Sequence, residues 1–333
     1  MVATCEESVA TYLAQAGESI TRDGKPQYAM STIQAWCTAI GYHYAAAGLP
    51  NPVCSETVRL TLARLGDLRA QSGAEADTAV PLSSPMLRRL VASIDESAQG
   101  WRDRIAARRD IALLVLQFAA GLRRSELVAM SVADVCPMSR SENPYLLIRV
   151  PATGGTVPGD EVAVGRGIDA RTCPGCVLLR WLTVLAVFDR AVASGAADSS
   201  AAGQLAVQRA LRRDDTGAEL HICDSNWPQF RRVRVPLFRP LDRDGLPHER
   251  AITARSVPNM LKRRALEAGF EPEVVAKLRG HSGRVGTIVQ ALANGADAQM
   301  VARHLRHRDA RTVSSYIEPG QAESVSVADH LGL

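Results

Sequence analysis

A stretch of small and polar residues from Gln71 to Ala79 divides this chain of 333 residues into two unequal parts. The stretch shows no apolar periodicity and is followed closely by prolines, a composition typical of a linker between domains. A chain of this length also exceeds one average domain. We therefore predict a small domain over residues 1–72, a linker over 73–83 and a larger domain over 84–333.

The first part is expected to be helical. Apolar residues recur at helical spacing over residues 5–16, 29–48 and 55–71, and the Gly/Pro-rich segment 48–52 separates the last two. Residues 1–78 carry five Lys/Arg and eight Asp/Glu, so this small helical unit is acidic within a chain whose net charge is +4. The excess of basic residues therefore belongs to the larger part.

The second part combines helical periodicity with two strand-like runs. Residues 145–150 and 161–164 are rich in aliphatic residues and flank a Gly/Pro turn, which predicts a β-hairpin. Residues 191–203 are rich in Ala, Ser and Gly, and we expect a loop there. Elsewhere the apolar spacing is helical. The expected fold class is mainly α with a small antiparallel β-sheet (α+β).

No apolar run approaches the eighteen or more residues that a membrane helix needs. The first residues, which include Glu6 and Glu7, lack the basic and then apolar order of a signal peptide. Seven cysteines are spread through the chain without a regular spacing, which favours reduced thiols over a disulfide framework. We expect a cytoplasmic protein that makes no contact with membranes.

The string Cys173-Pro-Gly-Cys176 has the spacing of half a zinc site, and His221 with Cys223 could supply further ligands. However, Cys176 begins an apolar run over 177–187 that is typical of a buried helix, where a free cysteine behaves as a small hydrophobe. The second interpretation is favoured, and no metal or other cofactor is predicted.

The segment Gly121-Leu-Arg-Arg-Ser-Glu-Leu127 follows a long apolar helical pattern. The glycine can end that helix and Ser125 can cap the next one, so Arg123 is expected on the turn between them. A guanidinium held there by Glu126 suits two oxygens of one phosphate. The alternative is a surface arginine beside a capping glutamate.

Two further strings lie nearer the C-terminus. His281-Ser-Gly-Arg284 brings an imidazole and a guanidinium to neighbouring positions at the start of a predicted helix, where both could address one phosphate. In the second string Tyr316 follows His307 by nine positions, and Asp309 is expected to cap a short helix between them. The first of these strings alone is usually just solvated surface, and the alternative for the tyrosine is a packed ring whose hydroxyl finds a partner.

Taken together, the order and spacing of these strings resemble the tyrosine recombinases, or phage-type integrases, and Gly280-His-Ser-Gly-Arg-Val-Gly286 is most similar to the Cre recombinase branch. The resemblance implies the tyrosine recombinase catalytic fold preceded by a small helical core-binding domain, similar around residues 32–64. It also implies a role for each of six residues. Arg123 and Arg284 would hold the phosphate, with Glu126 bracing Arg123. His281 and His307 would be the two histidines of the site, and Tyr316 the nucleophile.

The implied activity is site-specific DNA recombination through a 3′-phosphotyrosyl intermediate, without a cofactor. A phenol with a pKa of about 10 needs a proton acceptor, for which His281 is the candidate. The implied partner is double-stranded DNA carrying a specific recombination site, bound by a homotetramer that spans two such sites, with residues 324–331 as a helix that docks on a neighbouring subunit. The sequence does not separate phage integration, plasmid resolution and mobile-element movement as the biological role.

The chain departs from the family pattern at the hairpin, where a lysine would protonate the leaving oxygen. No lysine lies between Lys25 and Lys262, and Pro151 stands about where it is expected. Arg149 or Arg166 could stabilise developing charge there, although a guanidinium holds its proton too tightly to act as an acid. These two arginines, with Arg59 and Arg64 of the first domain, are also the candidate DNA contacts.

Two other departures concern the first domain and the third string. The N-terminal unit is expected to lack the first one or two helices of a usual core-binding domain, and its acidity is unfavourable for DNA. Arg306 replaces the glycine that usually precedes the histidine.

Three alternatives to a recombinase stay open: a DNA-binding or regulatory descendant without catalysis, an enzyme that relaxes DNA like a type IB topoisomerase, and a helical scaffold with a structural zinc site at Cys173 and Cys176.

Overall fold

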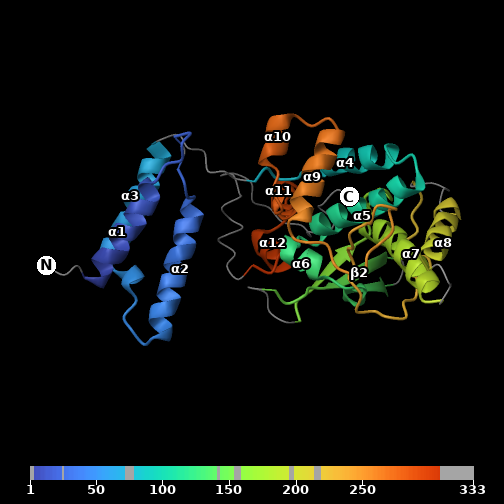
Figure 1. The fold of residues 1–333 in the computed structure, drawn as a ribbon, viewed down its shortest axis with the longest axis horizontal. Coiled ribbons are helices and arrows are strands. Elements are labelled where there is room, and N and C mark those ends of the chain that lie inside the picture. The colour runs from blue at the N-terminus through green and yellow to red at the C-terminus, as the bar shows by residue number, and fades with distance from the viewer. Residues whose placement is uncertain are drawn as a thin grey trace. The chain divides into compact units, whose positions relative to one another are not determined.

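The structure is a computed structural model that describes residues 4–24, 26–71, 79–140, 143–153, 159–194, 199–213 and 219–307. The chain divides into two compact units, Met1–Thr78 and Ala79–Leu333 (Figure 1). The role of the smaller unit as a core-binding domain stays a prediction. None of the helices in the described ranges has the length and apolarity that crossing a membrane requires.

The first unit contains α1 (Cys5–Glu18), α2 (Met30–Ala46), a 3₁₀ turn at Pro52–Cys54 and α3 (Glu56–Gln71). A capping box starts α1, because the Thr4 side chain accepts from the Glu7 N–H while the Glu7 carboxylate accepts from the Thr4 N–H at 2.8 Å. The helices enclose a small core that includes Leu13, Ile33 and Val58.

The second unit is mainly helical, as the sequence predicts. Its helices are α4 (Ser84–Glu96), α5 (Trp101–Ala119), α6 (Arg124–Ala129), α7 (Pro174–Val192), α8 (Ser199–Arg213), α9 (Ser256–Glu267), α10 (Pro272–Lys277), α11 (Ser282–Ala293) and α12 (Ala298–His304), with a 3₁₀ turn at Val132–Asp134. Helix α5 is buried almost all round from Asp110 to Ala119, and α4, α7 and α11 pack against it (Figure 1). This apolar helix is the centre of the core, and its C-terminal end leads into the Gly121–Leu127 segment.

A buried charge cluster joins α5 to α9. The carboxylate of Asp110 is fully buried and pairs with Arg109 at 2.7 Å and Arg264 at 2.8 Å. Because an unpaired buried carboxylate is costly, these arginines compensate the charge and fix α9 against α5.

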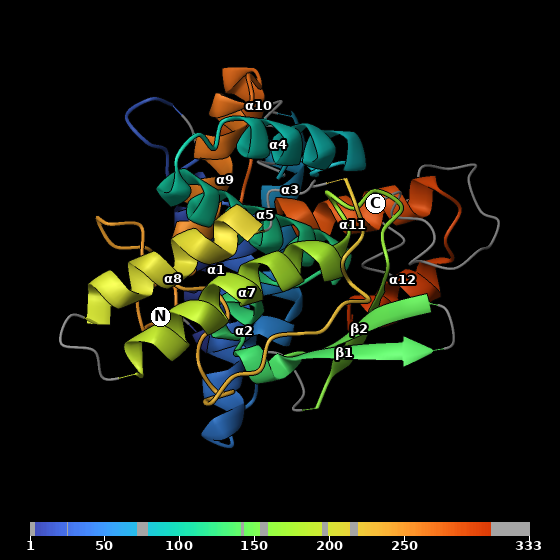
Figure 2. The same ribbon diagram turned by 90° about the vertical axis from the view of Figure 1, so that its right-hand side faces the viewer.

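The sheet has three antiparallel strands in the order β1 (Val135–Arg140), β2 (Asn143–Arg149) and β3 (Glu161–Gly165). The predicted hairpin corresponds to β2 and β3, which pair with Ile148 opposite Val162. Strand β1 was not predicted; Figure 2 shows it beside β2. Its Pro137 lacks a backbone donor, which an edge strand tolerates.

The loop predicted at residues 191–203 was wrong in part. Helix α7 continues to Val192 and α8 begins at Ser199. One of the small residues of this region is required by packing: a Cβ on Gly203 would lie 2.8 Å from the ring of Phe188. Gly203 allows α8 to approach α7 closely, which composition alone does not distinguish from a loop.

Candidate catalytic site

The end of α5 positions the first motif. Gly121 has a φ of +56°, a conformation that favours glycine, and a Cβ at this position would lie 2.1 Å from the Leu305 side chain. The chain then turns so that Arg123 occupies the N-cap of α6. Gly121 thus ends α5 and at the same time allows the end of α12 to approach this turn.

Glu126 is the anionic centre of the site. Its side chain is fully buried, and its carboxylate accepts from the Arg123 backbone N–H at 2.7 Å and from Arg123 Nη1 at 2.6 Å. The Arg123 side chain keeps one third of its surface exposed. One face of this guanidinium is therefore fixed by the carboxylate while part of the group still reaches solvent.

Arg284 connects the motifs through backbone carbonyls. It lies on the first turn of α11 with its side chain buried. Nη1 donates to the Gly121 carbonyl and Nη2 to the Leu305 carbonyl, each at 2.5 Å. The guanidinium thus holds the end of α5 and the end of α12 beside one another.

His281 occupies the N-cap of α11 at the surface, where neighbouring residues still cover part of its ring. Partial burial of the ring lowers its pKa, and the positive charges of Arg124, Arg284 and Arg123 lower it further. His281 is therefore neutral at physiological pH, so that a ring nitrogen can accept a proton.

Helix α12 ends in a Schellman motif that sets the position of His307. The His307 N–H donates to the Ala302 carbonyl at 2.9 Å, and the Arg306 N–H donates to the Arg303 carbonyl at 3.0 Å. Arg306 has a φ of +56°, the conformation for which glycine is preferred at this position. Burial lowers the pKa of His307 to about 4, with the charges of Arg284, Arg123 and Arg306 acting in the same direction.

The two histidines near the end of α12 differ in their contacts. His304 Nε2 lies 2.9 Å from the Ala119 carbonyl, so this ring is used to attach α12 to α5. The Nε2 atom of His307 is buried and has no hydrogen-bond partner within the part of the chain that the structure describes. Of these two histidines, His307 is therefore the one whose Nε2 lacks a partner among the described residues.

Arg306 is the site residue that sequence reasoning missed. Its Nη2 donates to Glu126 Oε2 at 3.0 Å, and only 7% of its side chain is exposed. The same carboxylate thereby pairs with Arg123 and Arg306. No local pattern could indicate a contact that spans 180 residues, so the sequence identified Arg306 only as a departure from the family pattern.

The other predicted residues lie elsewhere or outside the described ranges. Tyr316 and the segment 324–331 fall in residues 308–333, which the structure does not describe. Arg149 is exposed on β2 and pairs with Glu161 at 3.4 Å. Arg166 is exposed beside the Cys223 side chain.

The two candidate DNA contacts of the first unit lie on α3. Arg59 and Arg64 are both exposed, and Arg59 pairs with Glu56 at 2.9 Å. One of the two candidate contacts is therefore paired with a neighbouring carboxylate.

Comparison with known proteins gives one clear relative in sequence. The chain is 25% identical over 294 residues to a protein described as an integrase/recombinase xerD homolog from Selenomonas ruminantium, which covers 87% of this chain and 69% of that protein. No protein-family model matches the chain.

Among solved structures, similarity is found to the XerH site-specific recombinase bound to its difH substrate, with 13% identity, a TM-score of 0.40 and coverage of 91% of this chain and 72% of that one. It is also found to the Tn1549 transposon integrase in complex with circular intermediate DNA, with 15% identity, a TM-score of 0.44 and coverage of 98% and 84%. The sequence similarity to a recombinase over most of the chain supports the assignment of this protein to the tyrosine recombinase/integrase family.

Proposed function

We propose that this protein is a site-specific recombinase that cleaves and rejoins double-stranded DNA through a covalent bond to Tyr316. The observation that carries the proposal is the convergence of the motifs on Glu126, whose buried carboxylate binds Arg123 of the first motif and Arg306 of the third. Arg284 of the second motif attaches to the same turns. The similarity to a recombinase over 87% of the chain supports the same function.

The electrostatics of the site favour a phosphate ligand. Nearby arginines contribute to the lowered pKa of both His281 and His307, so the local field opposes further positive charge. A phosphodiester would supply the negative charge that this arrangement lacks. Guanidinium groups oriented before the reaction also stabilise charge that builds on phosphorus, and donors of this kind typically contribute roughly 10²–10³ each in rate.

In the proposed reaction the Tyr316 oxygen attacks the phosphorus while the phenolic proton passes to neutral His281. The bond from phosphorus to the 5′-oxygen breaks and that oxygen takes up a proton from water, which leaves a 3′-phosphotyrosine and a 5′-hydroxyl. A hydroxyl of a second strand then attacks the phosphotyrosine, which restores the phosphodiester and the free tyrosine. His307, whose low pKa keeps it neutral, would donate a hydrogen bond to a non-bridging oxygen.

The family branch, the assembly on DNA and the role of the first unit are proposed from the sequence. The Gly280–Gly286 string favours a Cre-like branch, and the recombinase resemblance favours a tetramer on two DNA sites with the first unit as the core-binding domain. Mobile-element movement or phage integration would use the same chemistry.

A catalytically inactive DNA-binding descendant is the second candidate, because the chain has no lysine between Lys25 and Lys262 to protonate the leaving oxygen. Arg149 is engaged with Glu161, which weakens it as a substitute. The two candidates differ in whether a covalent adduct forms.

The test uses a DNA duplex from the region flanking the gene, nicked near the cleavage position so that the released fragment diffuses away. Wild type should form a covalent protein–DNA adduct on a denaturing gel, and Tyr316→Phe should form none. Tyr145→Phe is the matched control, because it removes a phenolic hydroxyl on β2 and should leave the adduct unchanged. Binding of the duplex without any adduct would favour the inactive descendant, whereas relaxation of a supercoiled plasmid that lacks the site would favour topoisomerase activity.

A further inference from the structure

Four metal-ligating side chains converge outside the candidate catalytic site: Cys173, Cys176, His221 and Cys223. Their ligand atoms all lie within 4.8 Å of one another. Two belong to the first turn of α7 and two to the segment after α8, so the fold brings together pairs that are 45 to 50 residues apart.

The distances suit a tetrahedral ion. Cys173 Sγ lies 4.0 Å from Cys223 Sγ, and Cys176 Sγ lies 3.4 Å from His221 Nδ1. Zinc bonds of about 2.3 Å to sulfur and about 2.0 Å to nitrogen place tetrahedral ligands about 3.8 Å apart for two sulfurs and about 3.5 Å apart for sulfur and nitrogen. A disulfide would need sulfurs about 2.05 Å apart, so the spacing fits a shared ion better than a bond.

Neighbouring backbone groups orient the ligands. His221 Nε2 lies 3.2 Å from the Ile168 carbonyl, which accepts its hydrogen and leaves the Nδ1 lone pair directed at Cys176. The Ile222 N–H donates to Cys176 Sγ at 3.3 Å, an interaction that favours a thiolate. Outer contacts of this kind are typical of metal sites.

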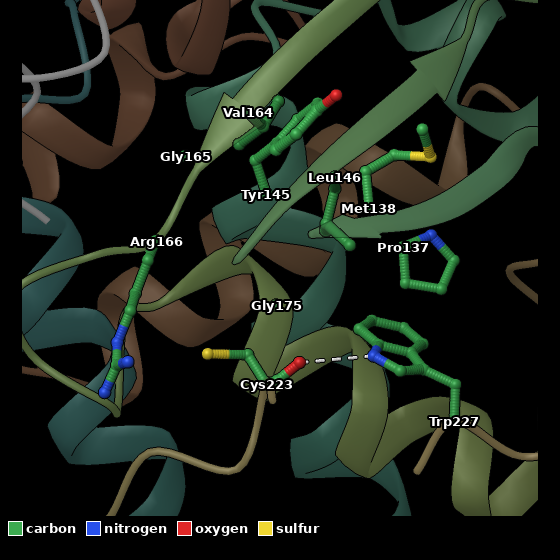
Figure 3. A pocket seen from close by; sticks show the side chains of 10 residues that line it. All are labelled: Pro137, Met138, Tyr145, Leu146, Val164, Gly165, Arg166, Gly175, Cys223 and Trp227. Atoms are coloured by element: carbon green, nitrogen blue, oxygen red, sulfur yellow. Dashed lines mark hydrogen bonds between the residues drawn. The ribbon is translucent and has the colours of Figure 1, made fainter. Parts of the chain in front are cut away.

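The local sequence allows the two segments to meet. A Cβ on Gly175 would lie 2.6 Å from the Cys223 Cβ, so glycine is needed between the first two cysteines. Trp227 Nε1 donates to the Cys223 carbonyl at 3.2 Å and holds the second segment in place, as Figure 3 shows together with the neighbouring Arg166. Cys173 is the N-cap of α7 and Cys176 lies in its first turn, where the helix dipole favours negative charge on the thiols.

The sequence favours cysteines buried as small hydrophobes over a metal site. The structure shows that Cys173 and Cys176 are indeed buried, at the first turn of the apolar helix α7. Burial as small hydrophobes does not explain why a half-buried histidine and a third cysteine converge on them with matching orientation.

We propose that Cys173, Cys176 and Cys223, through their Sγ atoms, and His221, through Nδ1, form a structural zinc site. With four protein ligands the site is closed to substrate, so its role is to attach the segment after α8 to the start of α7. The proposal is independent of the DNA chemistry at Glu126.

The test measures metal in protein purified without added metal and freed from any affinity tag. We expect about one zinc ion per chain in wild type and less than about a tenth in Cys173→Ser and Cys223→Ser. Cys136→Ser is the matched control, since it removes a thiol of the same unit outside the cluster and should keep the zinc. His221→Ala should lose the ion, whereas His221→Cys should keep it because thiolate replaces imidazole as ligand.

A second measurement, on wild type alone, tests the zinc site even if the variants fail to fold. Folded wild type that has been stripped with a chelator is titrated with Co²⁺, which should produce the visible absorption of a tetrahedral thiolate site and lose it when Zn²⁺ is added. The proposal is overturned if folded wild type binds neither ion, or if peptide mapping finds a Cys173–Cys223 disulfide in the protein as purified.

Discussion

Glu126 Oε2 lies 3.0 Å from Arg306 Nη2, an ion pair between two side chains that are 0% and 7% exposed. The other oxygen of the same carboxylate pairs with Arg123 at 2.6 Å. Glu126 therefore compensates the positive charges of two arginines. One of them, Arg306, is buried and lies 180 positions from Glu126 in the sequence. Its removal should affect stability as well as the orientation of Arg123.

Replacement of Glu126 by alanine is expected to lower the free energy of unfolding by about 3–5 kcal/mol, because it leaves the Arg306 guanidinium buried without a counter-charge. Urea unfolding followed by circular dichroism measures the change. Glu161→Ala is the control, since the Arg149–Glu161 pair is exposed and should cost at most about 1 kcal/mol. Equal effects of the two substitutions would contradict the role given to Glu126.

Arg306 combines a left-handed backbone with a buried ion pair, and two substitutions separate these features. Arg306→Gly and Arg306→Ala both lose the pair with Glu126, but only alanine keeps a Cβ at a φ of +56°. The glycine variant should therefore be more stable than the alanine variant by about 1 kcal/mol. Chemical denaturation measures both variants, and equal stability would show that the backbone there is not strained.

These contacts show where sequence reasoning succeeds and where it fails. Apolar periodicity predicted the helical nature of both units and the β2–β3 hairpin, because burial on one side is recorded in the local residue pattern. Strand β1 was missed because Pro137 and Ser139 interrupt its apolar character, and its pairing with β2 is a tertiary contact.

In the candidate site, too, local contacts could be predicted from the sequence and long-range contacts could not. The Arg123–Glu126 contact could be inferred from a spacing of three residues, but the approach of Arg306 to that carboxylate could not. The Cys173–Cys176 spacing likewise suggested half of a zinc site, whereas convergence with His221 depends on how the segment after α8 returns to α7. Contacts between distant segments are decided by packing and leave no periodic signal.

Gly286 should be intolerant of alanine. Helix α11 carries Arg284 and lies so close to the segment before α4 that a Cβ on Gly286 would lie 2.0 Å from the Leu82 carbonyl oxygen. Backbone cannot give way as a side chain can, so Gly286→Ala should cost about 1–3 kcal/mol and displace Arg284. Gly66→Ala in α3 is the control: its Cβ meets nothing within 4 Å, and alanine there should stabilise by roughly 0.5–1 kcal/mol. Thermal unfolding of both variants measures the difference, and a neutral Gly286→Ala would contradict the close packing.

Stability should fall as the pH drops from about 6.5 toward 4, because burial holds the pKa of His307 at about 4 while an unfolded histidine titrates near 6.5. In this window the unfolded state binds a proton that the native state refuses, which favours unfolding; above the window both states are neutral and the effect disappears. His281 and His304, whose pKa values are also lowered, act in the same direction.

The prediction is checked by urea unfolding at pH 7.5 and pH 5, in wild type and in His307→Gln. The glutamine variant should lose less stability between the two pH values, because one of the groups that resist protonation is gone. His248→Gln is the control, since this histidine is exposed and distant in sequence from the site. If His307→Gln shows the same pH dependence as wild type, the arginine-rich surroundings of His307 do not oppose its protonation, and the positive field proposed to attract a phosphate loses its support.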